Sequence, residues 1–131
     1  MTSPAYNLAQ HLETKGVGTF GGSSSWAISV SREPVEPDDA VTLYDTGGAA
    51  PVLFNEKTRD ETIQVRVRSK DYLSAYNKHD EIFGFLNAII NETIGGDDFI
   101  GVWLQSDILN VGRDDNDRQI LTANYRLERG S

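Results

Sequence analysis

One stretch constrains this chain more than any other: an alternating pattern that runs without a linker into a helical one. In residues 62–69 the β-branched aliphatic side chains Ile63, Val65 and Val67 alternate with polar or basic ones, which predicts a strand with one buried face. From Asp71 onward the apolar spacing changes to three and four, which predicts an amphipathic helix. With Ser69 or Asp71 as its cap and Gly95 and Gly96 at its end, this helix is roughly 24 residues long. A helix of that length predicts a sheet on which it packs.

The rest of the chain supplies the other elements of an α+β fold. We expect a mainly antiparallel or mixed sheet of about five strands, with one long and one short helix packed on one face. The segment 33–39, rich in proline and acids, is expected to be an exposed turn that returns the chain antiparallel. The remaining predicted elements are a capped helix over 3–15, a Gly/Ser loop over 16–25, strands over 26–31, 40–45, 99–105 and 119–128, a long connection over 46–60 and a polar turn over 110–117.

Composition excludes several classes of protein. A chain of 131 residues is expected to form a single domain over 1–131. The absence of cysteine excludes disulfides and thiolate zinc sites. No apolar run is long enough to span a membrane, and the first residues lack the pattern of a signal peptide, so we expect a protein made in a cytoplasm. A formal net charge of −8 argues against non-specific binding to nucleic acid, which depends on cationic side chains.

The catalytic and ligand-binding motifs are weak. The G-x-G-x-x-G of residues 16–21 follows a helix and precedes a strand, the reverse of a dinucleotide-binding turn, so it is interpreted as a loop. Asp114, Asp115 and Asp117 lack the glycine and glutamate of a calcium loop and are interpreted as a solvated turn. His79 lies on the apolar stripe of the long helix and is more simply a core histidine than a catalytic base. No catalytic residue, metal site or cofactor is therefore assigned.

Three stretches carry apolar or basic side chains beyond those that one small domain needs for its own core. They are the apolar cluster Pro51, Val52, Leu53 and Phe54 in the long connection, the strand over 99–105 that is apolar on both faces, and the polar strand face that carries Arg66 and Arg68. Each also has a simple structural account: a loop folded over its own core, a central strand and a solvated face. Together they favour a subunit that buries loop and strand surface against copies of itself. The cluster 51–54 with Arg66 and Arg68 is the predicted interface.

The same residues resemble a known family. The run V-T-L-Y-D-T-G-G at 41–48, then I-Q-V-R-V-R-S at 63–69, then Asp71-Tyr72 and Ala75-Tyr76 at the start of the helix, resembles the tail-terminator proteins of long-tailed bacteriophages, also described as tail-completion or minor capsid proteins. The resemblance covers roughly residues 37–94. These are strand and turn sequences and carry no chemical signature.

The resemblance implies a structural role in the virion tail, at the head–tail junction, after assembly in the host cytoplasm. It implies a homo-oligomeric ring, generally of six copies, that caps the tail tube and joins it to the head-side connector protein. DNA would pass through without specific binding, and Asp114, Asp115 and Asp117 are candidates for the lining of the bore. No enzymatic activity, cofactor or membrane contact is implied. Two alternatives remain: another tube or connector subunit, which predicts open polymers, and a small cytoplasmic enzyme that uses His79 with an acidic turn residue.

Overall fold

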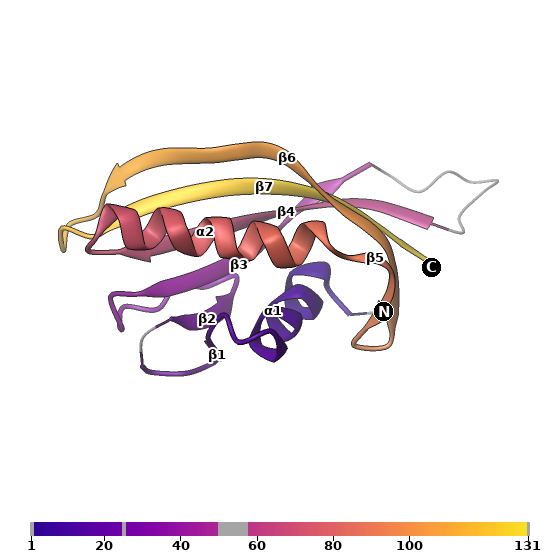
Figure 1. The fold of residues 1–131 in the computed structure, drawn as a ribbon, viewed down its shortest axis with the longest axis horizontal. Coiled ribbons are helices and arrows are strands. Elements are labelled where there is room, and N and C mark those ends of the chain that lie inside the picture. Colours follow the sequence, from indigo (N-terminus) through magenta and orange to yellow (C-terminus); the bar gives the residue numbers. More distant parts are fainter. Residues whose placement is uncertain (1, 25, 50–57, 131) are drawn as a thin grey trace.

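The fold is one mixed sheet with two helices against it. The computed structural model describes residues 2–24, 26–49 and 58–130 (Figure 1). The sheet has the strand order β1-β2-β3-β4-β7-β6-β5. Its elements are α1 (Pro4–Thr14), β1 (Thr19–Phe20), β2 (Ala27–Val30), β3 (Ala40–Gly48), β4 (Thr58–Ser69), α2 (Tyr72–Asn87), β5 (Ile90–Ile94), β6 (Asp97–Arg113) and β7 (Gln119–Gly130). The predicted α+β class is confirmed, with seven strands in place of about five.

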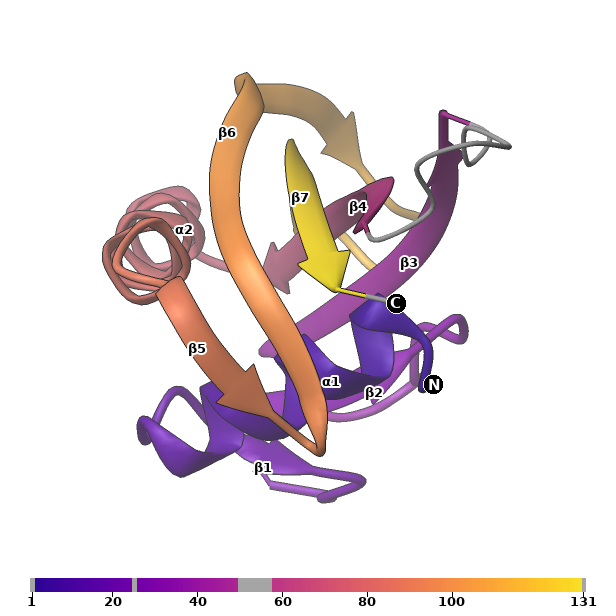
Figure 2. The same ribbon diagram turned by 90° about the vertical axis from the view of Figure 1, so that its right-hand side faces the viewer.

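Strands β4 and β7 form the centre of the sheet and carry much of its core. They pair antiparallel along their whole length, and the alternation predicted for 62–69 and 119–128 places Val65 opposite Ala123 and Val67 opposite Leu121 on one face. Both helices pack on this face, which leaves the opposite face, here called the open face, to polar residues of β4 and β7. Seen along its long axis, the sheet is strongly curled and β6 bends sharply (Figure 2). Each large apolar side chain buried between helix and sheet contributes on the order of 1.5–3 kcal/mol.

The short helix α1 forms as its sequence predicts. Ser3 is the N-cap and its hydroxyl accepts a hydrogen bond from the Tyr6 amide at 3.1 Å, while Pro4 occupies the first turn. Leu8 and Leu12 lie on its buried face. The predicted loop after it contains one further element, the two-residue strand β1, which pairs parallel to β2. The loop interpretation of residues 16–21 is thus right except at Thr19 and Phe20.

The long helix is shorter than predicted. Asp71 caps α2 through the Ser74 amide at 3.0 Å, but the helix ends at Asn87 and residues 90–94 form β5. Gly95 and Gly96 both have positive φ and form the two-residue turn between β5 and β6. The prediction failed because aliphatic residues near 90 fit the helical stripe, and because paired glycines can end a helix or turn a hairpin.

The segment 33–39 does not return the chain antiparallel, because β2 and β3 pair parallel. The chain crosses back and lies over one end of the open face. Two buried arginines hold it there: Arg68 donates to Glu33 Oε1 at 2.9 Å and to the carbonyl oxygens of Pro37 and Asp38, and Arg118 donates to the Val35 carbonyl. No local sequence pattern predicts these long-range contacts. They hold a parallel crossover that contains no helix.

Two connections are shorter than predicted because the flanking strands continue into them. Strand β6 extends over 97–113 and not only 99–105, so the polar turn covers about 114–118 instead of 110–117. In the same way β3 reaches Gly48 and β4 begins at Thr58, so both ends of the predicted connection 46–60 are paired strand.

Candidate assembly surface

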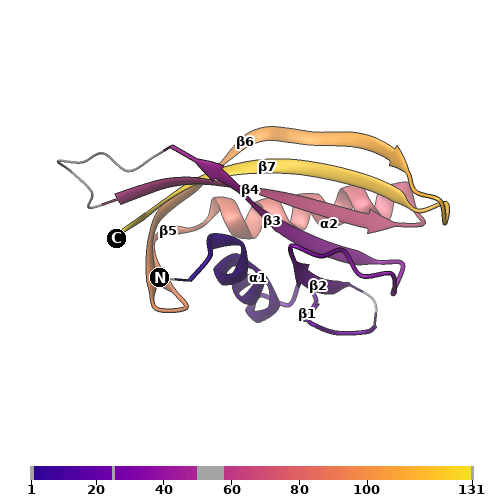
Figure 3. The same ribbon diagram turned by 180° about the vertical axis from the view of Figure 1, so that it is seen from behind.

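The distal parts of β3 and β4, here called the arm, form one end of the sheet together with the end of β7. Figures 1 and 3 show it at the end of the molecule where the two termini lie, opposite the turn between β6 and β7. A register shift between Asp45 and Gly47 bends the arm, and Gly48 makes it possible: a Cβ there would lie 2.3 Å from the Asp60 carbonyl oxygen. The predicted interface residues Pro51, Val52, Leu53 and Phe54 belong to the connection between the two strands and lie outside the described residues.

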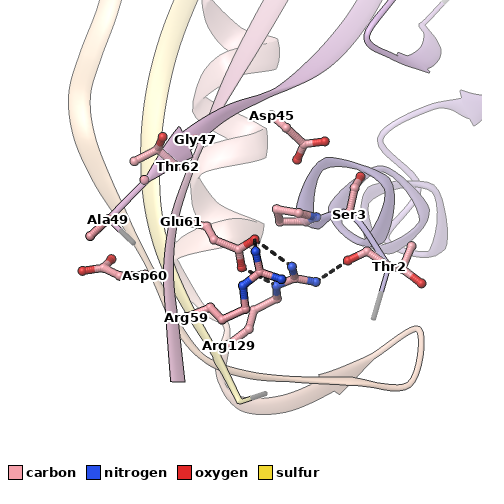
Figure 4. Close-up of a pocket in the computed structure, with 12 residues that line it drawn as sticks. Thr2, Ser3, Asp45, Gly47, Ala49, Arg59, Asp60, Glu61, Thr62 and Arg129 are labelled. Carbon is pink, nitrogen blue, oxygen red and sulfur yellow. Dashed lines mark hydrogen bonds and ion pairs between the residues drawn. The ribbon is translucent and has the colours of Figure 1, made fainter. Parts of the chain in front are cut away.

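A buried arginine fixes the base of this arm. Arg129, 1% exposed, donates to both carboxylate oxygens of Glu61 at 2.7 and 2.8 Å and to the carbonyl oxygen of Thr2 (Figure 4). Arg129, Glu61 and Thr2 line one side of an open pocket of about 500 Å³ between the arm and the start of α1. A bidentate pair of this kind fixes direction as well as distance. The arm is therefore attached rigidly to the body at its root.

Asp97 ties the same region to the N-terminal segment. Its Oδ2 accepts from the Asn7 side chain at 2.8 Å and from the Thr2 amide at 3.0 Å, and Arg129 lies 3.4 Å away. The hydrogen bond from Asn7, that from Thr2 and the charge of Arg129 together outweigh partial burial and hold the pKa of Asp97 below its ordinary value. This carboxylate is thus a structural anion.

The two predicted interface arginines lie on the open face but differ in accessibility. Arg68 is 2% exposed, and its nitrogens donate to Glu33 and to two carbonyl oxygens within the chain. Arg66 is about one-third exposed, and its Nε lies 2.6 Å from Glu33 Oε2 as an ion pair that is too far out of line for a hydrogen bond. Glu33 therefore joins both arginines, and only Arg66 presents accessible surface.

The three predicted acids of the bore lie together in the turn between β6 and β7. Asp114 accepts hydrogen bonds from the amides of Asn116 and Arg118 and from Arg118 Nε at 2.9 Å. Burial raises the pKa of Asp114, but these hydrogen bonds and the Arg118 charge outweigh it and lower the pKa overall. Asp115 and Asp117 are exposed, and Asp117 pairs with Arg113 at 3.4 Å. The turn thus presents two accessible carboxylates at the end opposite the arm.

A second exposed surface is the outer edge of β6, of which only residues 99–105 were singled out from the sequence. Strand β5 pairs with β6 only as far as Gly101, so residues 102–113 have no outer neighbour within the described parts of the chain. Trp103 is 42% and Leu109 63% exposed, and both face the open side because they pair with Arg126 and Thr122. Val111 is also exposed. The apolar run 99–105 suggested a partner-facing strand, but only the sheet order shows which edge is free.

Comparison with known proteins identifies the family. The profile of the family described as "Bacteriophage tail terminator protein" matches residues 11–129, nearly the whole chain. The chain belongs to this family. No curated protein matches the sequence. One solved structure, whose name describes no function, aligns with this chain at 12% identity and a TM-score of 0.45, over 95% of this chain and 96% of that chain. So distant a similarity gives no information about function.

Membership confirms the resemblance drawn from 41–48 and 63–69 and extends it in both directions, to residues 11–129. It makes this chain a structural protein of a phage tail, and hence a component of the virion. Among the described residues, no helix is long and apolar enough to cross a membrane. Within the same residues, no group of three or more His, Asp or Glu side chains is arranged to hold a metal ion.

His79, on which the enzyme alternative depends, is built into the core of this tail terminator. It is 1% exposed, and its Nε2 lies 2.8 Å from the Leu121 carbonyl oxygen. Burial lowers the pKa of His79, against the opposing effects of that hydrogen bond and of Asp107. The turn acids Asp114, Asp115 and Asp117 do not line the cavity beside it. The structure thus does not bring together the histidine and turn acid that the enzyme alternative requires.

Proposed function

We propose that this tail terminator forms a closed homo-oligomeric ring, of six copies, that caps the tail tube and joins it to the head-side connector protein. The observation that carries the proposal is the β3–β4 arm, whose two strands are joined by a sequence with an apolar cluster. An arm rooted through Arg129, with Pro51, Val52, Leu53 and Phe54 in the connection between its strands, is suited to bury apolar side chains against a neighbouring protein.

In this proposal the open face and the β6 edge contact the adjacent copy. Trp103 and Leu109 offer apolar area, and Arg66 with Glu33 offers a charged pair beside it. Arg68 acts indirectly, because it holds Glu33 in place. Register shifts interrupt the β6 edge at several points, which disfavours a long backbone ladder and favours contact through side chains. A heterologous contact of this kind closes into a ring when its rotation fits a whole number of copies.

The acidic turn is proposed to face the bore. Asp115 and Asp117 are exposed, and a ring of acidic copies repels the phosphate backbone, so DNA passes without being held. Asp114 shapes the turn through Arg118. Because this turn and the arm lie at opposite ends of the molecule, one end can serve the tube while the other meets the passage for DNA.

The experiment that tests the proposal separates the tip from the rest of the fold. Residues 50–57 are replaced by a short Gly/Asn turn that keeps β3 and β4 paired, and in a matched control by a Gly/Ser sequence of equal length. We expect both variants to unfold cooperatively like the parent and neither to cap tail tubes, because each lacks the apolar tip. If either variant still capped tubes, the role assigned to residues 51–54 would be wrong.

The alternatives predict different outcomes in the same assays. A tube or connector subunit would polymerise into open tubes instead of stopping at one ring. An enzyme would lose turnover in His79→Ala while keeping its assembly, whereas a tail terminator should lose only stability. The His79 change creates a cavity and removes a buried hydrogen bond, so we expect a loss of about 2–4 kcal/mol in unfolding free energy.

A further inference from the structure

The two strands of the arm are held unequally. Strand β4 pairs with β7 along its whole length, but β2 pairs with β3 only as far as Leu43, so residues 44–48 have no outer neighbour within the described parts of the chain. The register shift leaves Thr46 without a residue opposite it in β4, and Gly47 and Gly48 follow with φ of 93° and 133°. Because an open pocket of about 500 Å³ lies between this strand and the start of α1, close packing does not set the direction of the strand. Polar contacts are left to do so.

A polar contact joins this part of β3 to α1. Asp45 is the last residue before the register shift and lies beside the first turn of α1 (Figure 4). Its Oδ1 accepts a hydrogen bond from the Ala5 amide at 3.0 Å. Ala5 is fully buried, and an amide in the first turn has no acceptor within its own helix. The carboxylate therefore supplies an acceptor that this amide needs, at the end of the helix where the dipole favours a negative charge.

We propose that Asp45 is the positioning residue for the β3 side of the arm. Through the Ala5 amide it fixes the bend at residues 46–48 against α1, and it thereby sets the direction in which the chain leaves the sheet at Ala49. The bond joins positions 40 residues apart in the sequence. The apolar cluster 51–54 follows Ala49, so the consequence for assembly rests on the proposed function. The position of Ala49 itself does not.

The first test measures the position of Ala49 relative to α1 in the isolated protein. The chain has no cysteine, so Ala49→Cys with Gln10→Cys, both at exposed positions, takes up two nitroxide labels and no others. Electron paramagnetic resonance then gives the distribution of distances between the two labels. We expect a narrow distribution in the labelled parent and one at least twice as wide when Asp45→Ala is added. An unchanged distribution in Asp45→Ala would overturn the proposal.

Two matched variants separate positioning from a general loss of helix stability. Ser3→Ala also removes the acceptor of a first-turn amide, that of Tyr6, but the Ser3 hydroxyl makes no hydrogen bond to the described residues of the arm. Asp45→Asn keeps an oxygen that can accept from Ala5. We expect both variants to keep the narrow distribution. An equally wide distribution in Ser3→Ala would overturn the proposal, because the effect would then come from fraying of α1.

Capping of tail tubes by the unlabelled variants distinguishes this inference from the proposed function. The Asp45 side chain is exposed, so Asp45→Ala should still unfold cooperatively in urea. We expect its capping activity to fall at least fivefold, and that of Ser3→Ala and Asp45→Asn to stay at the parental level. If Asp45→Ala widened the distance distribution and tubes were still capped, the positioning role of Asp45 would stand and the role of the arm in capping would be wrong. If the distribution stayed narrow, the inference would fail whatever the capping result.

Discussion

At the scale of residues, buried arginines hold in place segments of this protein that neither strand pairing nor helix packing holds. Arg68 and Arg118 bind the crossover 33–39, and Arg129 binds the root of the arm. Each uses a carboxylate and a backbone carbonyl together, so that a buried charge is fully compensated. The alternation of 62–69 placed Arg68 correctly on the face opposite the helices. It could not reveal that a distant segment covers that end of the face.

The first prediction concerns Arg68. Arg68→Met leaves Glu33 and two carbonyl groups without their donor, and removal of one partner of a buried pair typically costs about 3–5 kcal/mol. Arg66→Met, at a side chain about one-third exposed, should cost about 1 kcal/mol or less. Urea unfolding measures both. Equal losses would mean that the crossover does not depend on the buried arginine.

The second prediction concerns the stability of the fold at acid pH. The folded-state pKa values of Asp97 and Asp114 lie below their ordinary value, so each contributes stability above about pH 4, the unfolded value, that is lost as the pH falls through the folded value. Asp97→Asn should lower stability at pH 7 by about 1–3 kcal/mol, since it weakens hydrogen bonds to a charged group. It should also flatten the acid limb of the stability curve. Asp115→Asn is the control, and an unchanged acid limb in Asp97→Asn would contradict the assignment.

At the scale of elements, local sequence patterns correctly predicted the features that depend on residues close together in the chain. The caps Ser3 and Asp71 and the period of two in β4 and β7 depend on near neighbours, and each was found as predicted. Strand β5 was missed because its pairing with β6 is decided by tertiary structure while its residues also fit a helix. The parallel pairing of β2 with β3 and the free edge of β6 depend on strand order, which no single segment encodes.

The arm gives a prediction at this scale. Gly48→Ala introduces a Cβ 2.3 Å from the Asp60 carbonyl oxygen at a φ of 133°, so pairing of the distal arm should be lost while the core remains folded. Gly47→Asn is the control, because nothing lies within 4 Å of a Cβ there and its cost is limited to the positive φ, which Asn adopts more readily than most residues. Hydrogen exchange of the Ala49 amide should accelerate only in Gly48→Ala, together with loss of tube capping. If Gly48→Ala disordered the arm and tube capping were unchanged, the arm would have no role in capping.

At the scale of the whole molecule, the open face and the β6 edge should decide self-association. Trp103→Asp with Leu109→Asp places charge on the exposed apolar side chains without touching the core, so the subunit should stay folded and its association should weaken at least tenfold. Leu73→Asp, at an exposed residue of α2 on the other side of the sheet, is the matched control. Sedimentation velocity measures both. Equal association of the two variants would show that the β6 edge is not an interface.

The central claim is that this tail terminator closes into a ring that caps the tail tube. The most direct measurement is the mass of the purified protein in solution at several concentrations, alone and with its tail-tube protein, followed by negative-stain imaging of the large species. We expect a closed ring of fixed mass, free or recruited to tube ends. A monomer indifferent to tubes, or an open polymer whose length grows with concentration, would contradict it.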